Sequence, residues 1–93
     1  MIKSFACKRT HMLHAENIAD KRFRAFARQA KKKLMMVHAA RDYGDLRSPP
    51  GNRLEKLSCD RAGPYSIRIN DQWRLCFRWS EGDAYDVEIC DYH

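Results

Sequence analysis

The chain has 93 residues, enough for one small domain, residues 1–93, around a single hydrophobic core. Its formal net charge is +6, from 18 lysines and arginines against 12 aspartates and glutamates. This excess favours a polyanionic partner, most simply nucleic acid, although a basic surface that only keeps the protein soluble would give the same count. No apolar run approaches the ~20 residues that span a bilayer, and the amino terminus lacks the apolar stretch of a secretory signal. We therefore expect a cytoplasmic protein that does not associate with membranes.

The cysteines and histidines predict no metal site and no cofactor. Neither C-x-x-C pairing nor zinc-finger spacing is found among the four cysteines, Cys7, Cys59, Cys76 and Cys90. Cys76 and Cys90 lie inside strand-like runs, and we interpret them as small packing residues rather than redox-active thiols. His11 and His14 offer two ligands without a third.

The first half of the chain is predicted to be mainly helical. Residues 2–6 predict a short strand, and residues 11–16 a helical turn. Between residues 20 and 41, apolar side chains recur at three- and four-residue steps and define one helical stripe: Phe23, Phe26, Ala27, Ala30, Leu34 and Val37. Asp20 is the expected N-cap, and Gly44 the expected stop signal.

The opposite face of this predicted helix is strongly basic, with Lys21, Arg22, Arg24, Arg28, Lys31, Lys32 and Lys33. Adjacent like charges cost a few tenths of a kcal/mol per pair on a helix. A helix that keeps them either meets an anion or lies in water. In the first case, we expect Lys31 and Lys32 to contact RNA.

The second half, beyond the proline loop at residues 49–52, alternates like a series of strands. Residues 53–57, 65–70, 73–79 and 84–90 are predicted as strands, with turns at 59–63, 70–71 and 80–83. The residues expected to point inward are Tyr65, Ile67, Ile69, Trp73, Leu75, Phe77, Trp79, Tyr85, Val87 and Ile89. Each strand buries one side, so the helices must cover the apolar face. The expected fold is α+β, a small antiparallel sheet with two N-terminal helices packed on one face.

Arginines then emerge on the other face of the sheet. Ser66, Arg68, Asn70, Arg74 and Arg78 share the side opposite the apolar residues. A guanidinium group binds phosphate oxygens in a fork that lysine cannot match. We expect Arg68 and Arg74 to stabilise negative charge on a phosphate. Arg78 fits better as a cross-strand partner of Glu88 or Asp86.

The chain closes with Asp91, Tyr92 and His93, directly after the last predicted strand. Cleavage of RNA needs a base for the 2′-hydroxyl proton, an acid for the leaving oxygen and cations around the phosphate, and it needs no metal. The candidates for this base and this acid are Asp91, His93 and Glu55. The phenol of Tyr92 is suited to stack on an unpaired base.

Several of these segments resemble one known family. Residues 45–55, 60–63 and 66–77, together with the terminal Asp91-Tyr92-His93, resemble the HigB toxins of the RelE/ParE superfamily, and most of all the host-growth-arrest (GraT) branch. The resemblance covers nearly the whole chain and is densest after residue 45.

The resemblance implies a toxin of a type II toxin–antitoxin system. It implies a RelE-like fold and cleavage of mRNA on the translating ribosome, which leaves a 2′,3′-cyclic phosphate. It also implies a HigA-like antitoxin with a helix-turn-helix domain, and operator DNA bound only through the complex. Arg74 falls on the family's phosphate-contacting arginine, Asp91, Tyr92 and His93 fall on its C-terminal catalytic cluster, and Arg68 on a basic slot that varies. We expect further RNA contacts from Arg53, Lys56 and Asn70.

The chain departs from the family pattern where other HigB proteins carry a His-Pro-Leu-Lys-Gly-Asp run. Here the histidine becomes Glu55 and the lysine becomes Ser58. Either Glu55 acts as the base, or Asp91 and His93 act without it. Lys56 supplies a positive charge one position away, although strand alternation turns it to the other face.

Two other functions are compatible with the sequence. A non-catalytic basic module would arrest growth by occupying RNA or the ribosome, and the missing histidine and the basic helix favour it. A structural subunit that serves only an antitoxin partner would cause no arrest.

Overall fold

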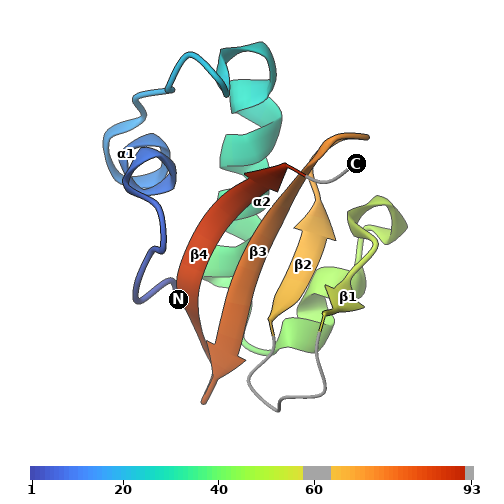
Figure 1. Ribbon diagram of the computed structural model, residues 1–93. Coiled ribbons are helices and arrows are strands. Elements are labelled where there is room, and N and C mark those ends of the chain that lie inside the picture. The colour runs from blue at the N-terminus through green and yellow to red at the C-terminus, as the bar shows by residue number, and fades with distance from the viewer. Residues whose placement is uncertain (58–63, 92–93) are drawn as a thin grey trace.

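The computed structural model describes residues 1–57 and 64–91, and the turn predicted at 59–63 lies outside them. The helical elements are α1 (Lys8–Glu16), α2 (Ala27–Ala39) and three short 3-10 turns, η1 (Arg24–Phe26), η2 (Tyr43–Arg47) and η3 (Pro50–Asn52). The strands are β1 (Glu55–Lys56), β2 (Tyr65–Arg68), β3 (Trp73–Ser80) and β4 (Asp83–Asp91). They form one antiparallel sheet in the order β1-β2-β3-β4. Figure 1 shows α2 lying across one face of this sheet, with α1 on the β4 side, which confirms the α+β prediction.

The predicted apolar stripe forms the helical half of the core. Phe23, Phe26, Ala30, Leu34 and Val37 are buried, and Ala27 packs against them. They meet the inward side chains of β2 and β3, so both halves of the chain contribute to one hydrophobic core. Within the described residues, no helix is both long enough and apolar enough to cross a membrane.

The long helix is shorter at both ends than the sequence predicted. Asp20 is not its N-cap: the Oδ1 atom of Asp20 accepts the Arg22 N–H at 3.0 Å and closes a turn seven residues before α2 begins at Ala27. The helix ends at Ala39, and the predicted stop, Gly44, lies inside η2. A capping box between Asp42 and Asp45 starts η2, which satisfies the backbone N–H groups there and makes a glycine stop unnecessary.

The amino-terminal segment covers the outer edge of β4 without forming the predicted strand at residues 2–6. Only two isolated parallel bridges occur there, Ile2 with Ala84 and Phe5 with Val87. The helical turn predicted at residues 11–16 is the C-terminal part of α1, which begins three residues earlier at Lys8. From α1, the hydroxyl of Thr10 accepts the Ile89 N–H at 3.0 Å. These contacts occupy edge N–H groups that would otherwise be open to another strand.

Tyr85 was predicted to point inward and does not. The residue is 36% exposed, whereas Ala84 and Val87 are fully buried. The register shifts between Cys76 and Arg78, and Asp86 opposite adopts a positive φ of 52°. A bulge inserts one residue into the alternation, so the inward position passes from Tyr85 to Ala84.

Three histidines lie near one another on the α1 side of the molecule, and two of them contact Phe5. The ring of His14 lies 5.2 Å from that of His38 and 5.7 Å from that of Phe5, and His11 stacks on Phe5 at 4.7 Å. Within the described part of the chain, no group of three or more His, Cys, Asp or Glu residues could hold a metal ion. Burial, then His38, Lys31 and His11, lowers the pKa of His14 below its ordinary 6.5.

This lowered pKa predicts acid-sensitive stability. The unfolded chain takes up a proton on His14 more readily than the folded chain, so the free energy of unfolding falls as pH drops through about 6.5. Urea denaturation at pH 7.5 and 5.5 measures the fall. We expect His14→Gln to reduce it, and an equal fall in both proteins would contradict this assignment.

Candidate functional site

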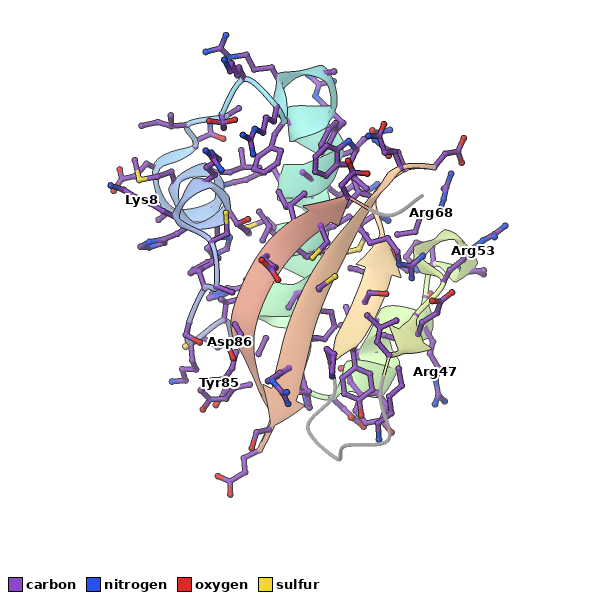
Figure 2. The ribbon with its side chains drawn as sticks, viewed as in Figure 1. Lys8, Arg47, Arg53, Arg68, Tyr85 and Asp86 are labelled. Atoms are coloured by element: carbon purple, nitrogen blue, oxygen red, sulfur yellow. The ribbon has the colours of Figure 1, made fainter. Side chains whose placement is uncertain are left out.

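One end of the sheet holds the predicted site residues Arg68, Asn70, Arg74 and Asp91. The end of β2, the beginning of β3 and the end of β4 meet there, and η3 leads into β1 beside them (Figure 1). The cationic corner, as we call it, consists of Lys33, Arg53, Arg68 and Arg74. Figure 2 shows Arg53 and Arg68 along the same edge of the molecule.

Arg74 is the buried centre of the cationic corner, with 9% of its surface exposed. Its Nε atom donates to Ser66 Oγ at 2.8 Å, and a terminal nitrogen donates to the carbonyl oxygens of Arg53 at 2.6 Å and Ser66 at 3.3 Å. A guanidinium group has five N–H donors in a fixed plane. The protein therefore uses part of this fork to hold the group in one orientation.

Arg68 lies directly opposite Arg74 across β2 and β3. Its guanidinium pairs with Asp71, three residues along, whose side chain is 98% exposed. Such an exposed pair contributes at most about 1 kcal/mol, so a phosphate could displace the carboxylate at low cost.

Arg53 is exposed and has a left-handed backbone, with φ 44° and ψ 58°. For an L-residue this conformation costs roughly 1–2 kcal/mol. It persists because Arg53 N–H donates to the Pro50 carbonyl at 3.1 Å and its own carbonyl accepts from Arg74. The strand predicted for residues 53–57 is thereby confined to Glu55 and Lys56.

Glu55 and Lys56 face opposite sides of the sheet, as alternation predicted. Glu55 is exposed and pairs with Ser66, so it shares the side of Arg74. Lys56 pairs with Tyr65, and its ammonium lies 5.8 Å from the centre of that ring. The structure therefore brings the carboxylate, but not the lysine, to the face of the cationic corner.

Asn70 and Asp91 lie at the same end of the sheet with their side chains engaged. The Oδ1 atom of Asn70 accepts the N–H groups of Gln72 at 2.9 Å and Trp73 at 2.8 Å, which closes the turn between β2 and β3. Asp91 stands opposite Trp73, and its Oδ2 atom accepts from Gln72 at 3.2 Å. Alternation along β4 turns Asp91 away from the Arg74 side.

The residue that faces Arg74 from β4 is Cys90, which the sequence indicated only as a packing residue. A hydrogen bond from the Cys90 thiol lowers the pKa of Cys76, while the same bond and burial raise the pKa of Cys90. Tyr92 and His93 lie outside the described residues, so their predicted roles stay predictions.

Sequence reasoning missed Asn52, which has no exposed surface. Its Oδ1 atom accepts a short hydrogen bond from Lys33, and its Nδ2 atom donates to the carbonyls of Leu46 at 3.2 Å and Ser48 at 3.4 Å. Burial, then Lys32 and Arg68, lowers the pKa of Lys33. No local signal marks this asparagine, because its partner Lys33 lies 19 positions away on α2.

The two lysines predicted to contact RNA differ in their surroundings. The ammonium of Lys31 donates to the carbonyls of Leu13 at 3.1 Å and His14 at 2.6 Å, in the last turn of α1. Lys32 is exposed. The first therefore joins the two helices, and the second remains the better candidate for an RNA contact.

This difference makes the lysines a matched pair. Lys31→Met is expected to lower the free energy of unfolding by about 1 kcal/mol, because a cation at a helix C-terminus is lost. Lys32→Met should leave stability unchanged and weaken binding to single-stranded RNA, measured by fluorescence anisotropy. Equal effects of the two substitutions on both properties would contradict the assignment.

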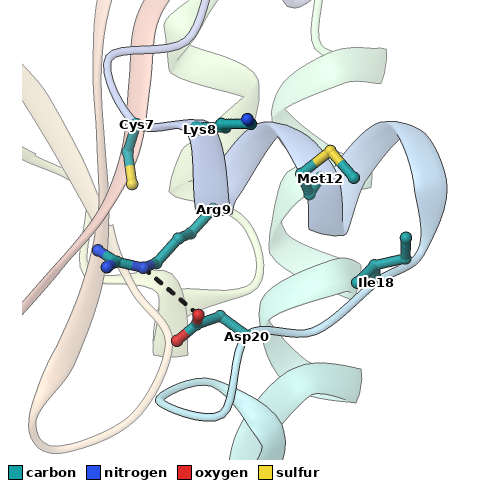
Figure 3. Close-up of a pocket in the computed structure, with 6 residues that line it drawn as sticks. All are labelled: Cys7, Lys8, Arg9, Met12, Ile18 and Asp20. Atoms are coloured by element: carbon teal, nitrogen blue, oxygen red, sulfur yellow. Dashed lines mark ion pairs between the residues drawn. The ribbon is translucent and has the colours of Figure 1, made fainter.

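A cavity of about 460 Å³ lies elsewhere, against α1. Figure 3 shows its lining residues Cys7, Lys8, Arg9, Met12, Ile18 and Asp20. Arg9 and Asp20 form an ion pair, with Nε 3.4 Å from Oδ2. The cavity contains none of the predicted site residues, and its walls are mainly apolar. The cationic corner, which is a surface feature, fits phosphate chemistry better.

Comparison with known proteins gives one consistent family. Residues 3–93 match the model of the RelE-like toxin of type II toxin–antitoxin system HigB. "Endoribonuclease HigB" of Proteus vulgaris is 30% identical over 93 residues, the full length of both chains. "Toxin HigB-1" of Vibrio cholerae is 45% identical over 58 residues, 62% of this chain and 61% of that protein. An uncharacterized protein of Haemophilus influenzae is 42% identical over 58 residues, so the chain spans about three fifths of these last two relatives.

These matches agree with the α+β fold and with the motifs that carried the resemblance, while closeness to the growth-arrest branch stays a prediction. The chain belongs to the HigB-like family, the RelE-like toxins of type II toxin–antitoxin systems.

Proposed function

We propose that this protein is a toxin that cleaves mRNA on the translating ribosome, in the cytoplasm, and thereby stops translation and growth. The observation that carries the proposal is the cationic corner, where three arginines and Glu55 gather at the end of the sheet from which the chain continues to Tyr92 and His93. The name of the Proteus relative, an endoribonuclease aligned over its whole length, supports it.

The proposed reaction is metal-independent attack of a 2′-hydroxyl on the adjacent phosphorus. The O–P bond to the 2′-oxygen forms while the bond to the 5′-oxygen breaks, which yields a 2′,3′-cyclic phosphate and a 5′-hydroxyl end. Glu55 takes the 2′-hydroxyl proton, and His93 gives a proton to the leaving oxygen. Arg68 and Arg74 stabilise the charge on the phosphate oxygens.

The proposed partners follow from the family. A type II toxin has an antitoxin, and we assign a HigA-like protein with a helix-turn-helix domain, through which the complex binds operator DNA. The exposed cations of α2, Arg28 and Lys32, are suited to ribosomal RNA, while Tyr92 is assigned to stack on a base of the mRNA.

Mapping of RNA 5′ ends after brief induction tests the proposal. We expect growth to stop and new 5′-hydroxyl ends to appear inside coding sequences, at positions that track the ribosomal A site. Purified ribosomes programmed with one mRNA should give the same ends, and naked mRNA should stay intact. Growth arrest with intact mRNA would refute the proposed cleavage.

A non-catalytic module that occupies the ribosome is the second candidate. It is favoured by the position of His11, His14 and His38, which lie together at Phe5 and α1 instead of at the cationic corner. In this case arrest would survive His93→Ala and would be lost on charge reversal at Lys32.

A further inference from the structure

Asn52 links the segments that meet beneath Arg53. Its amide group has no exposed surface and bonds to Lys33 of α2 and to the carbonyls of Leu46 and Ser48. The Asn52 N–H also donates to the Pro49 carbonyl at 2.9 Å. A buried side chain with these partners leaves the backbone around it little freedom.

Arg53 follows directly and is held from both sides. Its N–H donates to the Pro50 carbonyl at 3.1 Å, and its carbonyl accepts from Arg74 at 2.6 Å. Between these bonds, the left-handed backbone directs an exposed guanidinium to the edge where Arg68 lies (Figure 2). A non-glycine residue in this conformation persists only where its surroundings determine it, and such residues cluster at functional sites.

The charge balance at this position favours an anion. Lys33 bonds to a neutral amide oxygen rather than to a carboxylate, so its charge is not cancelled. Lys33 is also close enough to Arg68 for the guanidinium to disfavour the charged ammonium. Arg68 shares its charge with the exposed Asp71, whereas Lys33 bonds to a neutral group, so the cations keep a positive field that a phosphate group would neutralise.

We propose that Asn52 is a positioning residue, which fixes the left-handed turn so that the Arg53 guanidinium, beside Arg68, meets one phosphate of a single-stranded RNA. This inference rests on the proposed function, because it names RNA as the anion. Asn52 itself touches no substrate and acts only through Arg53.

The salt dependence of RNA binding distinguishes positioning from charge. The slope of log K against log salt falls by about 0.7 for each phosphate of a single strand that the protein no longer neutralises. Arg53→Gly removes one charge and suits the left-handed backbone, so it should reduce the slope of oligouridylate binding by about 0.7. Asn52→Ala removes no charge and should nevertheless reduce the slope by the same amount, and the double variant should show no further reduction.

Gln29→Ala provides the matched control, because it removes an exposed, uncharged amide from α2 and should keep the original slope. An Asn52→Ala protein with the original slope, or a double variant whose slope falls by the sum of two separate reductions, would overturn the inference. So would the absence of salt-dependent RNA binding by the unmodified protein. If Asn52→Ala does not unfold cooperatively, Asn52→Ser, which keeps a hydroxyl for Lys33, takes its place with the same expectation.

The assay also separates this inference from the proposed cleavage. Binding of oligouridylate requires no ribosome and no bond breakage, so coupling between Asn52 and Arg53 can hold even if mRNA stays intact. Conversely, cleavage on ribosomes with an unchanged slope for Asn52→Ala would overturn the positioning role alone.

Discussion

Arg74→Ala is expected to reduce mRNA cleavage on ribosomes at least 100-fold and to lower the free energy of unfolding by about 2–3 kcal/mol. The loss of activity follows because a preorganised donor is removed from the developing phosphate charge. The loss of stability follows because Ser66 Oγ and the Arg53 carbonyl lose a buried charged donor. Single-turnover cleavage and urea denaturation measure the two effects on the same preparations.

Two further variants separate charge, geometry and fold. Arg74→Lys keeps the charge without the planar fork, so we expect it to recover part of the stability but little of the activity. Arg78→Ala, on the same strand but farther from the corner, should keep cleavage near the original rate. An Arg74→Ala protein that cleaves normally would remove this residue from the mechanism and leave it a purely structural role.

Deletion of Tyr92 and His93 is expected to abolish cleavage with the fold retained. Positioned acid–base catalysis contributes about 10²–10⁴ in rate, and stacking of the base would be lost with it. The buried hydrophobic residues of the described structure run from Leu13 to Ile89, so the truncated protein keeps its core. Single-turnover cleavage gives the rate, and thermal unfolding checks the fold.

His93→Ala isolates the imidazole from the rest of the deletion. It should account for most of the fall in rate, while Tyr92→Phe, which keeps the stacking ring, should cost little. His11→Ala removes an exposed histidine far from the corner and serves as the control. A truncated protein that still cleaves mRNA would place the acid and base elsewhere, with Glu55 the next candidate.

Much of the fold could be predicted because it depends on short-range periodicity. The stripe from Phe23 to Val37 and the alternation along β2 and β3 are each visible within a few residues. The predicted side-chain directions were wrong where pairing with a neighbouring strand changed the alternation. Tyr85 points outward because the register between β3 and β4 shifts, and no residue in β4 indicates this shift from the sequence.

For the candidate site, the sequence predicted which residues share a face of the sheet, but not which hydrogen bonds they make within the protein. Arg68 and Arg74 could be placed on one face of the sheet from alternation alone, and Glu55 joins them through pairing with Ser66. The sequence could not predict that Arg74 is buried and donates to the backbone carbonyl of Arg53, since the two residues are 21 positions apart. The sequence likewise does not distinguish Lys31 from Lys32. Only the packing of α1 against α2 gives Lys31 its two carbonyl acceptors.

By itself, then, the amino-acid order determined which residue types face the core and which face the solvent, because adjacent side chains alternate at a spacing set by the backbone. Only the tertiary structure decided which polar groups are used internally. Asn52, Lys31 and Arg74 bond to atoms from distant segments, and such bonds depend on how helices and strands pack, not on what precedes or follows each residue.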